Sequence, residues 1–167
     1  GGGGAGGAGA GQGGGRVARR ADRSLRSRFV LPTHGRAGYT RFMTGNVLIV
    51  DDSLVARLSL KGILKETGLS LSEAPSGEAA LEALAAGPPP ALVFLDLTMP
   101  GLGGIETLRA IRDRFAGLPV VVVTADIQAK TLEAVRELGA FAIVRKPADK
   151  AEILGAAERA IGGGAAS

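Results

Sequence analysis

Five short apolar runs, each followed by an amphipathic stretch, constrain most strongly how this chain can fold. The runs are rich in Val, Leu, Ile and Phe, and they cover residues 47–50, 69–74, 91–95, 120–123 and 141–145. The stretches between them carry apolar residues at helical spacing. Strands this continuously apolar are covered on both faces. The pattern therefore predicts five β-α units that form a parallel sheet between two layers of helices.

Polar residues and glycines mark where the helices are expected to begin and end. Ser53 and Ser76 precede the first two helices and are suited to cap them. Asp149 precedes the last helix, with Glu152 three residues later, a spacing that predicts a capping box. Gly68 is expected to end the first helix, because glycine readily adopts the left-handed conformation of a helix C-terminus.

Charge is distributed unevenly along the chain. Residues 1–42 hold eight Arg and one acid, about +7, which leaves about −3 on the rest. Because residues 1–15 are nearly all Gly and Ala, they cannot bury enough apolar surface to offset the entropy of ordering. We expect a disordered Gly/Arg-rich extension at 1–45, one domain at 46–161 and a disordered tail at 162–167. The basic residues of the domain are scattered among acids, so no nucleic-acid partner is expected.

Cysteine content and hydropathy bear on the compartment. The chain has no Cys, which excludes disulfides and thiol chemistry and fits the cytosol. Its apolar runs are too short to span a bilayer, and no signal peptide opens it. We therefore expect a cytoplasmic location without membrane insertion.

Polar residues follow four of the five expected strands. Asp51 and Asp52 follow the first, Asp96 the third, Thr124 the fourth and Lys146 the fifth. The carboxyl ends of parallel strands meet at one edge of a sheet, where ligands gather. Three carboxylates within about 4 Å of one another would repel by roughly 4 kcal/mol per pair at an effective dielectric near 20, so the cluster calls for a cation. Oxygen ligands suit Mg²⁺ beside a phosphate, and Lys146 and Thr124 would face that anion.

Four motifs carry a resemblance to a known family. They are residues 50–53 (Val-Asp-Asp-Ser), 95–101 (Leu-Asp-Leu-Thr-Met-Pro-Gly), 122–125 (Val-Val-Thr-Ala) and 145–147 (Arg-Lys-Pro). The chain resembles a receiver domain of the two-component response regulators over residues 46–161. The resemblance implies a flavodoxin-like (βα)5 fold, a doubly wound parallel sheet with strand order 2-1-3-4-5.

The resemblance also implies a chemistry. Asp96 would accept a phosphoryl group from a phosphohistidine on a sensor histidine kinase or a phosphotransfer protein. Mg²⁺ would be bound by Asp52, Asp96 and the backbone carbonyl of Thr98, with Asp51 helping through water. Phosphoryl transfer needs positioning and neutralisation of spreading charge more than covalent help from other side chains.

The remaining implied roles concern signalling. Lys146 would pair with the phosphoryl oxygens, and Thr124 would bond one of them and so report the modification. The protein would be no enzyme beyond its own phosphorylation and dephosphorylation. Because only residues 162–167 follow the last helix, we expect a stand-alone, chemotaxis-type receiver that acts by binding an output protein.

Three features depart from the family pattern. Ile143 stands where an aromatic ring often rotates between inward and outward states, and Ala148 stands where Phe is frequent. An aromatic rotation mechanism is therefore not expected. Gly103-Gly104 replaces the usual Asp-Gly in the loop after Pro100, which should loosen that turn.

Other function classes fit the sequence less well. A haloacid-dehalogenase-like phosphatase also uses a strand-end Asp and Mg²⁺, but it needs a second acid two residues later, where this chain has Thr98. A nucleotide- or flavin-binding module would need a Gly-rich loop after the first strand. A degenerate receiver that serves only as a docking surface would not need all five functional positions. The alternatives differ in turnover: a phosphatase hydrolyses a phosphate ester many times, whereas a receiver keeps the phosphate on itself.

Overall fold

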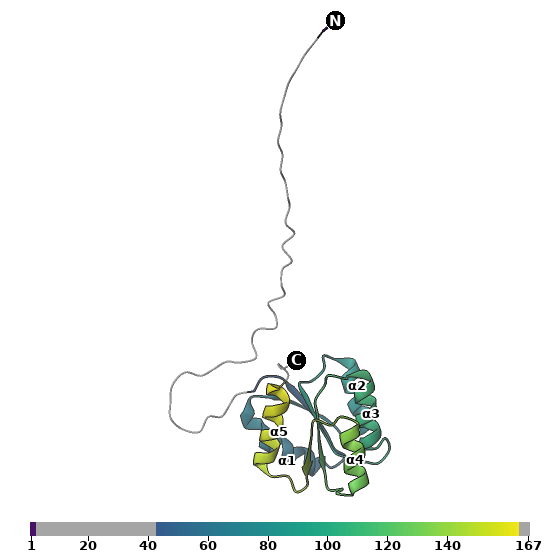
Figure 1. The fold of residues 1–167 in the computed structure, drawn as a ribbon. Coiled ribbons are helices and arrows are strands. Elements are labelled where there is room, and N and C mark those ends of the chain that lie inside the picture. The colour runs from purple at the N-terminus through teal and green to yellow at the C-terminus, as the bar shows by residue number, and fades with distance from the viewer. Residues whose placement is uncertain (3–42, 164–167) are drawn as a thin grey trace, which may run out of the picture.

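The computed structural model describes residues 1–2 and 43–163, so what the sequence predicts for residues 3–42 and 164–167 lies outside the described part (Figure 1). Along the described part, strands and helices alternate. The elements are β1 Asn46–Val50, α1 Leu54–Leu64, the 3-10 turn η2 Lys65–Thr67, β2 Ser70–Ala74, α2 Gly77–Ala86, β3 Leu92–Leu95, α3 Gly104–Arg114, β4 Val120–Thr124, α4 Ala129–Glu137, β5 Ala142–Arg145 and α5 Lys150–Gly162.

The five strands form one parallel sheet in the order β2-β1-β3-β4-β5, which confirms the predicted fold class. Strand β1 lies between β2 and β3, with Val50 paired to Ala74 on one side and to Leu95 on the other. The carboxyl ends of β1 and β3 are therefore level. The acids that follow these two strands begin from neighbouring positions at the same edge.

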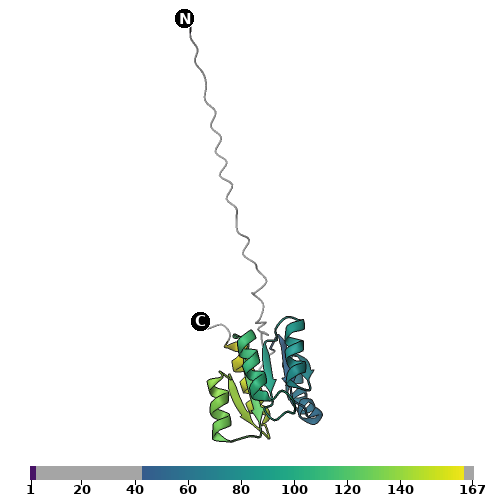
Figure 2. The ribbon, with the colours of Figure 1, turned by 90° about the vertical axis from the view of Figure 1, so that its right-hand side faces the viewer.

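The side chains of the strands alternate between two separate cores. Val47, Ile49 and Phe94 face one side of the sheet, where they pack with residues of α1 and α5. Leu48 and Leu95 face the other side, with residues of α2, α3 and α4. Figures 1 and 2 show these two helix layers on either side of the sheet. Because both faces are covered, every residue of β3 and β4 is buried.

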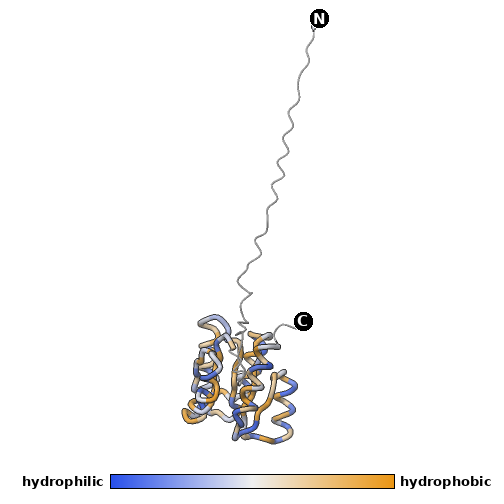
Figure 3. Tube along the Cα trace, turned by 90° about the vertical axis from the view of Figure 1, so that its left-hand side faces the viewer, coloured by the Kyte–Doolittle hydropathy of each residue, from blue (hydrophilic) through white to orange (hydrophobic). Residues whose placement is uncertain are grey.

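Hydrophobic and hydrophilic residues alternate along the helices, as the colours of Figure 3 show. In α1, Leu60 and Leu64 are buried at a spacing of four residues, whereas Ser59, just before them, and Gly62, between them, are exposed. Within residues 1–2 and 43–163, no helix combines the length and the apolar content that crossing a bilayer requires.

The two predicted serine caps are present, and the predicted capping box is not. The Ser53 hydroxyl accepts a hydrogen bond from the Ala56 amide at 3.3 Å, and the Ser76 hydroxyl accepts one from Ala79 at 3.2 Å. Asp149 occupies the N-cap position of α5, but within the described part of the chain its side chain makes no capping bond. Residues 149–152 are all exposed, so water can satisfy the amides of the first turn.

Packing begins before the first strand. Met43 is 7% exposed within the core on the α1 side, and its amide donates to the carbonyl of Thr67 at 2.8 Å. The domain boundary at residue 46 stays a prediction, and Met43 lies three residues ahead of it.

Candidate functional site

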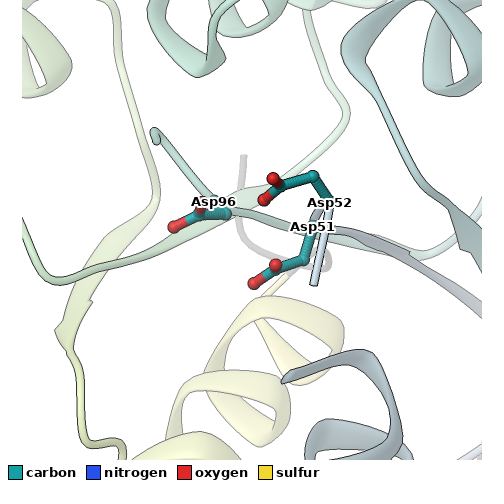
Figure 4. A group of neighbouring side chains, drawn as sticks. All are labelled: Asp51, Asp52 and Asp96. Atoms are coloured by element: carbon teal, nitrogen blue, oxygen red, sulfur yellow. The ribbon is translucent and has the colours of Figure 1, made fainter. Parts of the chain in front are cut away.

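Three carboxylates come together at the carboxyl edge of the sheet. Asp51 and Asp52 follow β1 and Asp96 follows β3, and one oxygen from each lies within 4.8 Å of the other two (Figure 4). Asp51 and Asp96 are buried, at 2% and 4% exposure, whereas Asp52 is exposed. The cluster therefore combines two buried acids with one exposed acid.

Backbone amides orient the two buried acids. Asp51 accepts a hydrogen bond from the Ser53 amide at 2.8 Å, and Asp96 accepts one from the Thr98 amide at 3.1 Å. In each case the carboxylate bonds the amide two residues later, the local turn that Asp favours where a strand ends. The Asp96 amide also donates to the carbonyl of Val50 at 2.8 Å, which ties the two strand ends together.

Lys146 lies between the two buried acids. Its ammonium donates to Asp51 Oδ2 at 2.7 Å and to Asp96 Oδ1 at 3.0 Å. Burial disfavours the charge of Lys146, but the hydrogen bonds to Asp51 and Asp96 outweigh that cost and raise its pKa above the ordinary value. The lysine is thus held charged beside the acids. The peptide bond from Lys146 to Pro147 is cis.

Thr124 ends β4 and is fully buried. Its hydroxyl accepts a hydrogen bond from the Asp126 amide at 3.0 Å, and its carbonyl accepts one from the Lys146 amide at 2.9 Å. Asp126 in turn accepts hydrogen bonds from the Gln128 amide at 2.9 Å and from the Thr131 hydroxyl at 2.9 Å. The hydroxyl of Thr124 is therefore engaged with the loop that begins α4, and not with the acids.

The arrangement suits a hard divalent cation next to an anion. Carboxylate oxygens are the ligands that such ions prefer, and three of them within 4.8 Å are close enough to share one ion. Lys146 then provides a positive charge beside the two buried acids. The acidic group could hold a metal ion, as the sequence predicted from the repulsion among the acids.

Two residues that the sequence analysis did not single out support the first loop of the site. The guanidinium of Arg57 donates to the carbonyl of Asp51 at 2.7 Å and to that of Asp52 at 3.3 Å. It also forms an ion pair with Glu73 of β2 at 3.2 Å. The only signal in the sequence is an Arg five residues after Asp52, with an acid near the end of the next strand.

The turn after Pro100 was expected to be loose, and the structure shows it closed by hydrogen bonds. The Leu102 amide donates to Glu78 Oε1 of α2 at 2.8 Å, and the Gly104 amide donates to the carbonyl of Leu97 at 3.2 Å. Gly104 packs against the backbone of Asp96, so that a Cβ at this position would collide with the carbonyl oxygen of Asp96. The glycine permits this close approach, and a neighbouring helix holds the loop.

The comparison with protein families decides the identity. The family model of the response regulator receiver domain matches residues 47–158. The chain belongs to this family. Receiver domains are signalling modules of two-component systems, which act through phosphorylation and interact with histidine kinases or phosphotransfer proteins.

Curated relatives place the receiver in different proteins. The DNA-binding transcriptional regulator NtrC of Escherichia coli (strain K12) is 36% identical over 117 residues, which cover 70% of this chain and 25% of NtrC. A protein-glutamate methylesterase/protein-glutamine glutaminase of Trichodesmium erythraeum is 38% identical, over 69% of this chain and 32% of that protein. The two-component response regulator ORR5 of Oryza sativa subsp. japonica is 30% identical, over 70% of this chain and 88% of ORR5. The chain thus spans about a quarter to a third of the first two relatives.

Solved structures agree in fold. NtrX from Brucella abortus in complex with ADP superposes with a TM-score of 0.67 at 32% identity, over 73% of this chain and 28% of NtrX. A response regulator receiver protein from Pseudomonas putida superposes with a TM-score of 0.65 at 30% identity, over 68% of this chain and 95% of that protein.

Proposed function

We propose that this receiver accepts a phosphoryl group on Asp96 from the phosphohistidine of a sensor histidine kinase or a phosphotransfer protein. In this step the phosphorus–nitrogen bond of the donor breaks, a bond forms between phosphorus and a carboxylate oxygen of Asp96, and the imidazole leaves with the bonding electron pair. The protein catalyses only this reaction and the later hydrolysis of the acyl phosphate.

One observation carries the proposal: the carboxylate of Asp96 is at once buried, charge-paired and part of the acid cluster. Lys146 contacts it at 3.0 Å, and Asp51 and Asp52 lie within the same 4.8 Å group. A cation beside the acceptor neutralises charge that spreads over a phosphoryl group during transfer. A proposed nucleophile, a positive partner and a candidate metal site thus lie next to one another.

The metal we propose is Mg²⁺. Asp52, Asp96 and the backbone carbonyl of Thr98 would bind it, with Asp51 contributing through water, and the oxygen-only donor set fits this hard ion. When bound, the ion offsets the repulsion between the acids and an incoming phosphate. Lys146, which contacts Asp96, would pair with the phosphoryl oxygens.

Thr124 is the residue we propose as the reporter of phosphorylation. Its hydroxyl bonds the Asp126 amide, and Asp126 holds the first turn of α4 through Gln128 and Thr131. A hydroxyl that turned toward a phosphoryl oxygen would leave the Asp126 amide. The start of α4 would then have to rearrange.

For the output of the receiver, we propose the kind of partner and not its identity. We propose that the phosphorylated receiver acts by binding an output protein, without contacting nucleic acid itself. Stand-alone organisation and a cytoplasmic location stay predictions. The relatives differ in how much of their length the receiver fills: the match covers 25% of NtrC and 88% of ORR5.

The test is phosphorylation with acetyl phosphate, followed by mass spectrometry. The parent should gain one phosphoryl group in the presence of Mg²⁺ only, and the adduct should be labile to hydroxylamine, as an acyl phosphate is. Asp96→Asn keeps the shape of the side chain and removes the nucleophile, so labelling should vanish. Lys146→Ala removes a charge-assisted contact of about 1.5–3 kcal/mol, and should slow labelling or switching roughly ten- to a hundredfold.

Asp52→Asn separates metal binding from acceptance of the phosphoryl group. Labelling of this variant should be slow at low Mg²⁺ and should return to the rate of the parent at high Mg²⁺. If Asp96→Asn labels as fast as the parent, or if labelling survives full chelation of the metal, the proposal is wrong. Many turnovers of a small phosphate ester, without a stable adduct, would instead favour a phosphatase.

A further inference from the structure

Asp52, the exposed acid of the site, is held differently from the two buried acids. Asp51 and Asp96 each accept a hydrogen bond from a backbone amide, and each forms an ion pair with Lys146. The carboxylate of Asp52 makes no hydrogen bond to any residue in the described part of the chain. Among the described residues, only the backbone of the loop between β1 and α1 therefore locates this carboxylate.

Arg57 holds that backbone. Its Nη1 donates to the carbonyls of both Asp51 and Asp52, and so fixes the two peptide planes on either side of Asp52. Glu73 of β2 pairs with its Nε at 3.2 Å, and the Arg57 side chain is only 13% exposed. The loop is thus braced against the neighbouring strand by a partly buried side chain that uses Nη1 for the two carbonyls and Nε for Glu73.

The stability of α1 does not account for this arginine. A cation in the first turn of a helix lies at the positive end of the helix dipole, where an acid would be favourable. No acid occupies the first turn of α1. A positive charge near a metal site also opposes a divalent cation, so its presence needs another reason.

We infer that Arg57 is a positioning residue for the metal site: by holding the carbonyls of Asp51 and Asp52, it aims the Asp52 carboxylate at the ion, and Glu73 anchors it. This inference rests on the proposed Mg²⁺ site. Positioning and charge predict opposite effects on Mg²⁺ binding when Arg57 is removed. Removing Arg57 removes a positive charge, which by electrostatics alone would tighten Mg²⁺ binding, whereas loss of positioning weakens it.

The chain offers a matched control on the same helix. Lys61 lies one turn after Arg57 and pairs with the other oxygen of Glu73 at 2.7 Å, but no hydrogen bond joins it to either carbonyl within the described residues. Lys61→Met therefore removes the same charge and one partner of Glu73 while leaving the brace in place. Only Arg57→Met removes the brace.

The experiment is a titration with MgCl₂ alone, followed by amide NMR shifts, on the full chain. Arg57→Met should weaken Mg²⁺ binding about tenfold, the loss typical of residues that orient metal ligands. Lys61→Met should bind as the parent does, or slightly more tightly. With the metal chelated, the Ser53 amide should exchange faster in Arg57→Met than in Lys61→Met, because the turn it closes has lost its support.

Each outcome has a distinct meaning. Mg²⁺ binding by Arg57→Met that equals or exceeds the parent's overturns the positioning role and leaves the proposed function intact. A parent that binds no Mg²⁺ overturns the metal site and this inference together. If Arg57→Met does not fold, the milder Arg57→Gln takes its place with the same expected sign.

Discussion

The ammonium group of Lys146 forms ion pairs with two acids at once. Asp51 and Asp96 are buried next to each other, and a single ammonium group donates to both at 2.7 and 3.0 Å. Removing either acid leaves the other paired, whereas removing the lysine leaves two buried carboxylates facing each other. The lysine therefore contributes to the stability of the fold by itself.

The raised pKa of Lys146 gives this contribution a pH dependence. Burial lowers the pKa and the hydrogen bonds to Asp51 and Asp96 raise it by more, so the folded state holds the proton more tightly than the unfolded chain. The stabilisation is therefore complete below the unfolded pKa of about 10.4 and is lost as the pH rises through the higher folded value.

Urea unfolding of the parent and of Lys146→Met checks this sign at about pH 8 and about pH 11.5, on either side of the ordinary lysine pKa. The free energy of unfolding of the parent should fall relative to the variant at the higher pH. Lys150→Met is the control, because its ion pair with Glu66 is exposed at the surface and should contribute little at either pH. A difference between parent and Lys146→Met that grows at the higher pH would contradict the prediction.

At the scale of elements, signalling should run from β4 into α4. Ile143 of β5 is partly buried against the core on the α4 side, where a branched aliphatic side chain cannot swing as an aromatic ring does. The Thr124 hydroxyl, in contrast, is one hydrogen bond away from Asp126, which holds the start of α4. We therefore expect activation to change residues 124–131 more than β5.

Amide hydrogen exchange with and without beryllofluoride, a phosphoryl mimic, measures this. Exchange in residues 124–131 should change on binding. Thr124→Val keeps the shape of the side chain without its hydroxyl, so the change should largely disappear in that variant. Changes centred on β5, with residues 124–131 silent, would show that the signal takes another route.

The sequence predicted the strands and helices better than it predicted the side-chain contacts between them. The strands were placed within one residue of their observed ends, since apolar runs and flanking polar residues are local features. The meeting of Asp51, Asp52 and Asp96 followed from the rule that parallel strands end at one edge. The Arg57–Glu73 pair and the Glu78–Leu102 bond depend on how far side chains reach between elements 16 and 24 residues apart, which no local pattern records. The Asp149 capping box failed because the first turn of α5 is exposed and needs no protein partner.

At the scale of the whole molecule, the packed unit should be stable without the residues that precede it. The composition of residues 1–42 gives them no core of their own. A chain that starts at Met43 should therefore keep its melting temperature within about 2 °C, a fraction of a kcal/mol at this size.

A start at Asn46 should behave differently, because Met43 is buried and its amide bonds Thr67. Losing the burial of one such side chain costs about 1.5–3 kcal/mol, which corresponds to a fall in melting temperature of about 5–10 °C. Calorimetry on both chains, with mass spectrometry to confirm that Met43 is retained, gives the comparison. A fall on the order of 10 °C for the chain that starts at Met43 would show that the preceding residues pack on the domain.

The contact of Gly104 with the backbone of Asp96 limits how this protein can diverge. Surface charges around the site can be exchanged gradually, each with a small effect, but this position admits no side chain at all unless α3 moves away from the backbone of Asp96. A genetic selection for lost signalling that spared every charged residue should therefore return substitutions at Gly104. Its relatives should keep a glycine there while their partner-binding surfaces drift, because shape and not charge restricts that side of the site.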